Sequence, residues 1–120
     1  MKALVLNDTR ISRHVGCEIV MTQLHKYCLS YGLEVVASIS LDRYFESNVT
    51  NHLKKVDVVI INGEGTMHGD SIQAYRILSF ARKARLRGVP VVLLNTLWFN
   101  NSTLNEFLED IDLISCRESK

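Results

Sequence analysis

The segment from residue 62 to residue 70 carries the side chains that proton transfer requires, and it follows directly on an apolar run. Glu64 offers a carboxylate and His68 an imidazole, and both groups can donate or accept a proton during a reaction. Three glycines stand among them, and glycine lets a backbone approach a ligand closely. This combination indicates a ligand site with a general acid or base.

The glycine spacing argues against a dinucleotide site. A G-x-G-x-x-G fingerprint would need glycine where His68 stands, and it would follow the first strand of a unit. A purely structural alternative stays open, in which the segment is a tight turn and Asp70 caps the next helix.

A second loop, residues 7–16, is predicted to bind an anion. It leads into a helix N-terminus, where free backbone N–H groups attract negative charge, and Arg10 and His14 add donors. In the alternative interpretation Asp8 and Arg10 pair with each other, and Ser12 or His14 caps the helix.

Alternating apolar runs and helical stripes must position these loops. The predicted strands are residues 2–6, 33–39, 57–61, 89–95 and 111–116. The predicted helices are residues 16–31, 48–55, 71–87 and 103–109. Strands separated by helices favour an α/β fold of three layers, with a parallel sheet and right-handed crossovers.

Two of the helices have recognisable faces and ends. The first stripe is Cys17, Val20, Met21, Leu24, Cys28 and Tyr31, and the second is Ile72, Tyr75, Leu78 and Ala81. Gly32 and Gly88 mark the two helix ends. The cations in residues 82–87 complement the second helix dipole, with a phosphate-rich partner as the alternative.

Loop lengths favour the strand order 2-1-3-4-5 of flavodoxin-like sheets over the Rossmann order 3-2-1-4-5. The longest polar loops follow the first and third strands, and they meet only if these strands are neighbours. The order 2-1-3-4-5 places them together at the topological switch point, where a crevice opens.

The composition limits the classes of protein to which the chain can belong. The 120 residues are 47% hydrophobic and 22% charged, which predicts a single domain with a real core. A formal net charge of +1 argues against nucleic acid or an anionic membrane as the main partner. The first apolar run is too short for a membrane span or a signal-peptide core, so we expect a soluble cytoplasmic protein.

The three cysteines predict neither a disulfide nor a metal centre. Cys17 and Cys28 share one predicted helix and stand roughly 16 Å apart, beyond disulfide reach. Cys116 stands alone, and the chain has no Cys/His spacing typical of zinc. We expect reduced thiols, no metal and no cofactor.

Several segments together resemble the polysaccharide pyruvyl transferase family. The most specific is Asn-Gly-Glu-Gly-Thr-Met-His-Gly-Asp at residues 62–70, which precedes a helix and the strand at residues 91–95. Residues 7–10 with residues 14–17 look like the start of one branch of that family. Residues 112–119 are similar to its Asp-x-Ile-x-x-Arg-Glu-Ser segment.

The resemblance implies transfer of a pyruvyl group from phosphoenolpyruvate to two sugar hydroxyls, which forms a ketal on a cell-surface polysaccharide. Glu64 and His68 would then be the catalytic acid and base, while cations and the helix start would hold phosphate and carboxylate. The implied substrate-binding residues are Asn7, Asp8, Arg10, His14, Gly16, Asn62, Gly63, Gly65, Thr66, Asn95 and Arg117.

Members of this family have two Rossmann-like domains in a glycosyltransferase-B-like arrangement, and the chain resembles the N-terminal one. We therefore expect a second domain or subunit to be needed for turnover. Residues 97–99, Leu-Trp-Phe, could form part of a surface for that domain or for a second copy in a homodimer. The alternative function is a non-catalytic module that binds a sugar or a nucleotide sugar.

Overall fold

A computed structural model describes residues 1–12, 15–63, 72–96 and 105–116. Its strands are β1 (Lys2–Leu6), β2 (Glu34–Ile39), β3 (Val58–Asn62), β4 (Val91–Thr96) and β5 (Leu113–Cys116). Its α-helices are α1 (Val15–Ser30), α2 (Phe45–Leu53) and α3 (Ile72–Leu86), and its 3₁₀ helices are η1 (Thr9–Ser12) and η2 (Asn105–Asp110). The predicted alternation of strands and helices is confirmed.

The five strands form one parallel sheet in the order β2-β1-β3-β4-β5. In the centre, Val5 of β1 lies opposite Ser38 of β2 on one side and Ile60 of β3 on the other. The predicted flavodoxin-like order is therefore confirmed. Because Leu6 pairs with Ile61, β1 and β3 end side by side at the same edge of the sheet.

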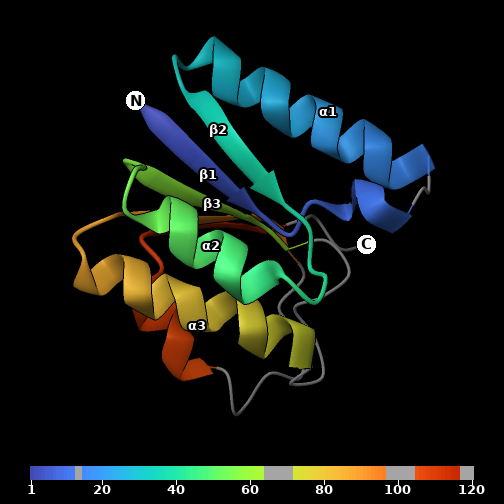
Figure 1. The fold of residues 1–120 in the computed structure, drawn as a ribbon. Coiled ribbons are helices and arrows are strands. Elements are labelled where there is room, and N and C mark those ends of the chain that lie inside the picture. The colour runs from blue at the N-terminus through green and yellow to red at the C-terminus, as the bar shows by residue number, and fades with distance from the viewer. Residues whose placement is uncertain (13–14, 64–71, 97–104, 117–120) are drawn as a thin grey trace.

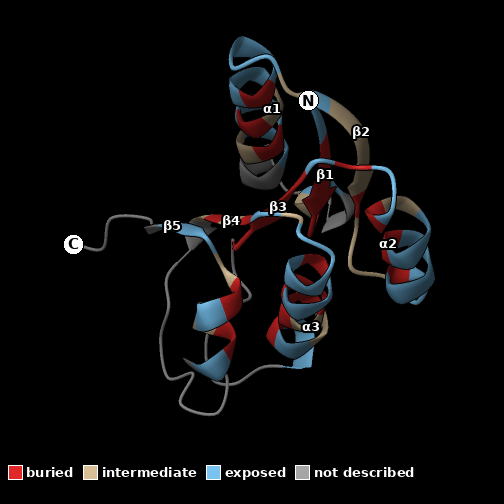
Figure 2. Ribbon diagram, turned by 90° about the vertical axis from the view of Figure 1, so that its left-hand side faces the viewer, coloured by how far each residue is buried: buried red, intermediate tan, exposed pale blue. Residues whose placement is uncertain are grey.

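Helices cover both faces of the sheet, with α1 on one side and α2 and α3 on the other (Figures 1 and 2). Successive side chains of a strand point to opposite faces. Leu4 and Leu6 of β1 accordingly join the larger core under α2 and α3, whereas Ala3 and Val5 join the smaller core under α1. None of the helices in the described ranges is long and apolar enough to cross a lipid bilayer.

Helix α2 begins earlier than residue 48, the predicted start, because Phe45 anchors its first turn. This side chain is fully buried, and its ring meets that of Phe80 on α3 edge to face at 5.7 Å between centroids. The next apolar positions, Val49 and Leu53, follow at intervals of four residues and are buried as well.

The predicted faces of the other two helices are partly wrong. Tyr31 lies just past the end of α1 and is 79% exposed, and Ile72 and Tyr75 on α3 are 76% and 55% exposed. Leu78 and Ala81 are buried as predicted, and the face of α3 that packs on the sheet consists of Ala74, Ile77, Leu78, Phe80, Ala81 and Ala84. Small alanines allow close approach to the sheet, so the buried stripe lies to one side of the predicted one.

Both predicted helix ends are confirmed. Gly32 and Gly88 adopt positive φ angles of 76° and 77°, which glycine reaches without strain. After α1, the Leu33 N–H donates to the Cys28 carbonyl at 2.8 Å, and after α3 the Val89 N–H donates to the Ala84 carbonyl at 2.9 Å. These bonds satisfy carbonyls that each helix would otherwise leave unpaired.

The segment between β4 and β5 contains a 3₁₀ helix, η2, where the sequence predicted an ordinary helix. It is held against α3 by Phe107, which is buried beneath the guanidinium of Arg82 at 5.0 Å. Arg82 also donates from Nε to Asp110 at 3.1 Å, and Arg85 donates to the Glu109 carbonyl. These contacts give two of the cations at the end of α3 a structural role.

Candidate functional site

The loops after β1 and β3 begin next to each other at the carboxyl edge of the sheet. Asn7 follows β1 directly, while Asn62 closes β3. The Gly63 N–H donates to the Leu94 carbonyl at 2.8 Å and so continues the pairing with β4 for one more residue. The structure thus brings together the starts of the two loops that the sequence singled out.

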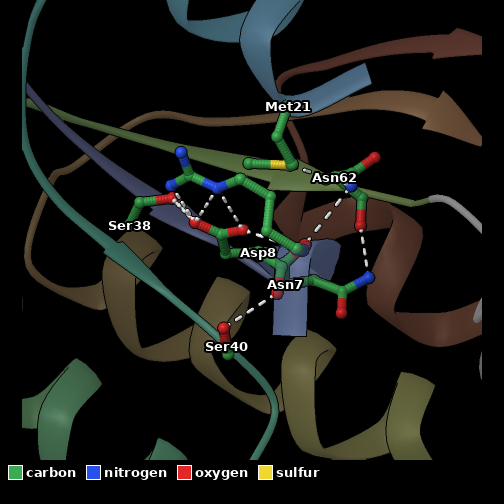
Figure 3. A network of polar contacts seen from close by, with 7 residues as sticks. Asn7, Asp8, Met21, Ser38, Ser40 and Asn62 are labelled. Carbon is green, nitrogen blue, oxygen red and sulfur yellow. Dashed lines mark hydrogen bonds and ion pairs between the residues drawn. The ribbon is translucent and has the colours of Figure 1, made fainter. Parts of the chain in front are cut away.

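Two asparagines connect the loops by reciprocal hydrogen bonds (Figure 3). The Asn7 side-chain amide donates to the Asn62 carbonyl at 2.8 Å, and the Asn62 amide donates to the Asn7 carbonyl at 3.3 Å. The Asn62 amide also lies 3.4 Å from the Met21 sulfur on α1. Because both asparagines are buried, this pair fixes the distance between the loops where they leave the sheet.

Asp8 is held by groups from its own loop and from β2. The Arg10 guanidinium donates to both of its oxygens, from Nε at 2.9 Å to Oδ1 and from Nη2 to Oδ2. The Ser38 hydroxyl donates to Oδ2 at 2.7 Å, and the Ser40 hydroxyl donates to the Asp8 carbonyl at 2.8 Å (Figure 3). The local pairing that the sequence allowed as an alternative is therefore present.

These contacts set the charge at this end of the sheet. Burial raises the pKa of Asp8, but the hydrogen bonds from Arg10 and Ser38 together outweigh it and hold that pKa below its usual range. The Arg10 side chain remains 43% exposed, so part of it is still reached by solvent. Arg10 can contact an anion there, although Asp8 compensates much of its charge.

His25 of α1 lies close to the ion pair of Asp8 and Arg10. The sequence did not predict this position. Burial, and next the charge of Arg10, hold the pKa of His25 below its usual range, against the opposing influence of Asp8. Its Nε2 atom is buried and has no hydrogen-bond partner among the described residues. Only its spacing of four residues from the buried Met21, which places it on the same side of α1, could have indicated this position.

The remaining site predictions are placed only in part. Gly16 stands in the first turn of α1, and Asn95 stands in β4, the strand next to β3. The others, Glu64, His68, Gly65, Thr66, His14 and Arg117, lie outside the described residues. Residues 97–99, predicted as a surface for a second domain, lie outside them as well.

Comparison with known proteins adds no family to this geometry. No family model matches the chain, and no curated protein does. Fold and site are therefore described by the structure, and the family resemblance rests on the motif residues.

The described polar groups of the site mainly bond to one another. The carboxamides of Asn7 and Asn62 join the two loops, and the hydroxyls of Ser38 and Ser40 bond to Asp8. Among these groups, the partly exposed Arg10 is the one that a ligand oxygen can reach. Among the described residues, no group of three or more His, Cys, Asp or Glu side chains could hold a metal ion. Proton transfer would require the carboxylate and imidazole of the following loop residues.

Proposed function

We propose that this chain provides the N-terminal part of the active site of a polysaccharide pyruvyl transferase-like enzyme. The supporting observation is the pair of hydrogen bonds between Asn7 and Asn62. It joins the first residues of the two loops that resemble this family, although 55 positions separate them in sequence. Two sequence motifs that belong to one active site have to lie close together in the fold.

The proposed reaction joins phosphoenolpyruvate and a sugar with two free hydroxyls. A proton is delivered to the methylene carbon, and the first hydroxyl oxygen bonds to the adjacent carbon, which bears the phosphate. The second hydroxyl then bonds to that same carbon as the bond to the phosphate oxygen breaks. Of the two hydroxyl protons, one ends on the new methyl group and the other on the released phosphate.

We assign the proton transfers to Glu64 and His68 on the resemblance, since one acid and one base are required. Arg10, whose side chain is 43% exposed, would contact the carboxylate or phosphate of the donor substrate. The Asn7 and Asn62 pair would hold the two loops at a fixed separation, which favours a preorganised site. Turnover is proposed to need a second domain or subunit.

A titration of the 120-residue chain with phosphoenolpyruvate tests the proposal. We expect saturable shifts of the amide NMR signals of Asn7, Asp8, Asn62 and Gly63, and weaker effects from inorganic phosphate or pyruvate alone. Arg10→Gln should weaken this binding about tenfold, since a charge-assisted hydrogen bond is lost. The matched control Arg43→Gln changes an exposed arginine that contacts Tyr44 instead, and it should bind normally.

The alternative is a non-catalytic module for a sugar or a nucleotide sugar. Asp8 compensates the positive charge of Arg10, so the described polar groups of the site are mainly neutral. This observation favours the alternative function. Saturable shifts with a sugar nucleotide, together with none from phosphoenolpyruvate at millimolar concentration, would contradict the transferase proposal and support this one.

A further inference from the structure

The sheet face that carries α1 has an apolar groove of about 800 Å³ beside that helix. Its floor consists of side chains from two neighbouring strands, namely Val58 and Ile60 of β3 and Val92 and Leu94 of β4, and Leu113 of β5 lines its edge. On β4 the contrast between the two faces is sharp. Val91 and Leu93 are fully buried under the α3 side, whereas Val92 and Leu94 on the groove side are only half-buried.

The part of this sheet face that α1 leaves uncovered is about as wide as one helix. Met21 and Leu24 of α1 pack in one cluster with Val5 of β1 and Ile60 of β3, so α1 covers those two strands. Beyond them lie β4 and β5, and two strands at ~4.8 Å spacing span about the 10 Å diameter of a helix. Across the described residues, α1 is the only helix on this face (Figure 2).

Exposed apolar side chains border the groove. On α1, Tyr27 is 65% exposed, and Tyr31 just beyond the helix end is 79% exposed; both line the groove. On the opposite border, Leu113 of β5 is 58% exposed. An apolar patch of this kind, concave and next to a core, is typical of an interaction surface.

A second copy of the chain stacked on this face fits poorly. Such stacking would press the outer side of α1 against an apolar sheet, and that side carries the exposed polar residues Thr22, Lys26 and Ser30. The ammonium of Lys26 would then lose its water. The exposed side chains of the groove, Tyr27, Tyr31 and Leu113, offer roughly 300–450 Å², which is below the ~800 Å² per partner of a stable interface.

We propose that the groove binds an amphipathic α-helix of a partner polypeptide. Such a helix, about 10–14 residues long, would place an aliphatic stripe with i, i+3, i+4 and i+7 spacing on β4 and β5. Its polar side would lie beside the outer side of α1, which exposes Thr22, Lys26 and Ser30 together with Ile19 and Leu29, so no charged side chain of α1 would be buried. This inference does not depend on the proposed transfer reaction.

The test uses the 120-residue chain and a synthetic 14-residue peptide with leucines at those spacings and Glu or Lys elsewhere. A peptide of the same composition with the stripe scrambled is the control. We expect the striped peptide to shift the methyl NMR signals of Val92, Leu94 and Leu113, and to leave those of Leu78, on the other side of the sheet, unchanged. Equal binding of both peptides, or no shifts from either at 1 mM, would overturn the proposal.

Paired variants on α1 separate groove binding from general effects. Tyr27→Glu should weaken binding of the striped peptide at least tenfold, because it places a charge at the groove border. Leu29→Glu alters a residue that is 77% exposed and about 200° further round the same helix, and it should bind normally. If ultracentrifugation shows a dimer of the chain that Tyr27→Glu dissociates, a second copy occupies the groove and the proposal is wrong.

Discussion

At the scale of single residues, Asn7 combines an unusual backbone with a structural hydrogen bond. Its φ of 68° lies in the left-handed region, which disfavours most side chains but suits asparagine and glycine. Asn7→Ala should lower the free energy of unfolding by about 2–3 kcal/mol, because it adds backbone strain to the lost hydrogen bond. Asn7→Gly loses only the bond and should lower it by about 1 kcal/mol.

Urea unfolding followed by circular dichroism measures the order of these variants. Wild type should be the most stable, Asn7→Gly next and Asn7→Ala the least. If the alanine variant proved as stable as the glycine variant, the left-handed backbone at position 7 would not explain why asparagine stands there.

Asp8 should make stability depend on pH in the acid range. The pKa of this carboxyl is lower in the folded chain than its usual 3.8, so the unfolded chain takes up a proton first as the pH falls. Its contribution is therefore complete above that value and is lost as the pH falls through the folded-state pKa. Asp8→Asn should cost about 1 kcal/mol at pH 7 and progressively less below pH 4, since the partner Arg10 is partly exposed.

Unfolding of both proteins by urea at pH 7, 5, 4 and 3 checks this expectation. Asp57→Asn serves as the control, because among the described residues its carboxylate accepts a single, exposed hydrogen bond, from the backbone N–H of Lys2. A difference between wild type and Asp8→Asn that stays constant down to pH 3 would show that the charge of Asp8 does not stabilise the fold.

Some of these contacts could be predicted from the residue types, and others could not. Asp8 and Arg10 are two positions apart, and a short spacing of opposite charges made their pairing foreseeable. The bonds between Asn7 and Asn62 depend on two strands being neighbours, which is a property of the sheet and not of either loop. His25 was missed because a histidine on a helix shows nothing of the neighbouring loop packed against it.

At the scale of elements, the helix ends are set by backbone conformation. A Cβ added at Gly88 would meet no atom within 4 Å, so Gly88→Ala introduces strain from the φ of 77° without a clash. We expect a loss of about 1 kcal/mol in the free energy of unfolding. Gly88→Asn should lose clearly less, because asparagine tolerates the left-handed region.

Thermal unfolding monitored by circular dichroism at 222 nm compares these two variants with wild type. The same pair at Gly32, which has a φ of 76° and equally open surroundings, provides an internal repeat. Equal stability of the alanine and asparagine variants would rule out backbone strain as the reason for glycine at these helix ends.

Strands were easier to predict than helix faces. A strand buried on both sides is apolar throughout, as in β3, so its pattern leaves little choice. On α3, apolar residues occupy more than one side of the helix, and only packing decides that Ile77 faces the sheet while Ile72 does not. The contacts of η2 with Arg82 and Arg85 are likewise tertiary, and the sequence pattern of residues 105–110 does not distinguish a 3₁₀ helix from an α-helix.

At the scale of the whole molecule, the strand order followed from the lengths of two loops, and with it the adjacency of the ends of β1 and β3, from which these loops start. The chemistry of the candidate site did not follow in the same way. Hydrophobic burial and strand register determine where Asn7 and Asn62 lie. Residues 64–71, where the proposed acid and base stand, lie outside the described residues.

The pairing of β1 with β3 also has a consequence for synthesis of the chain. β1 is made first, yet its bonds to β3 must wait until partners about 55 residues further along have left the ribosome. Until then β1, an apolar strand that is buried in the folded protein, has one unpaired edge in the nascent chain. Segments of this kind aggregate or recruit chaperones. Closing this long-range pair is therefore the step on which productive folding of the sheet centre depends.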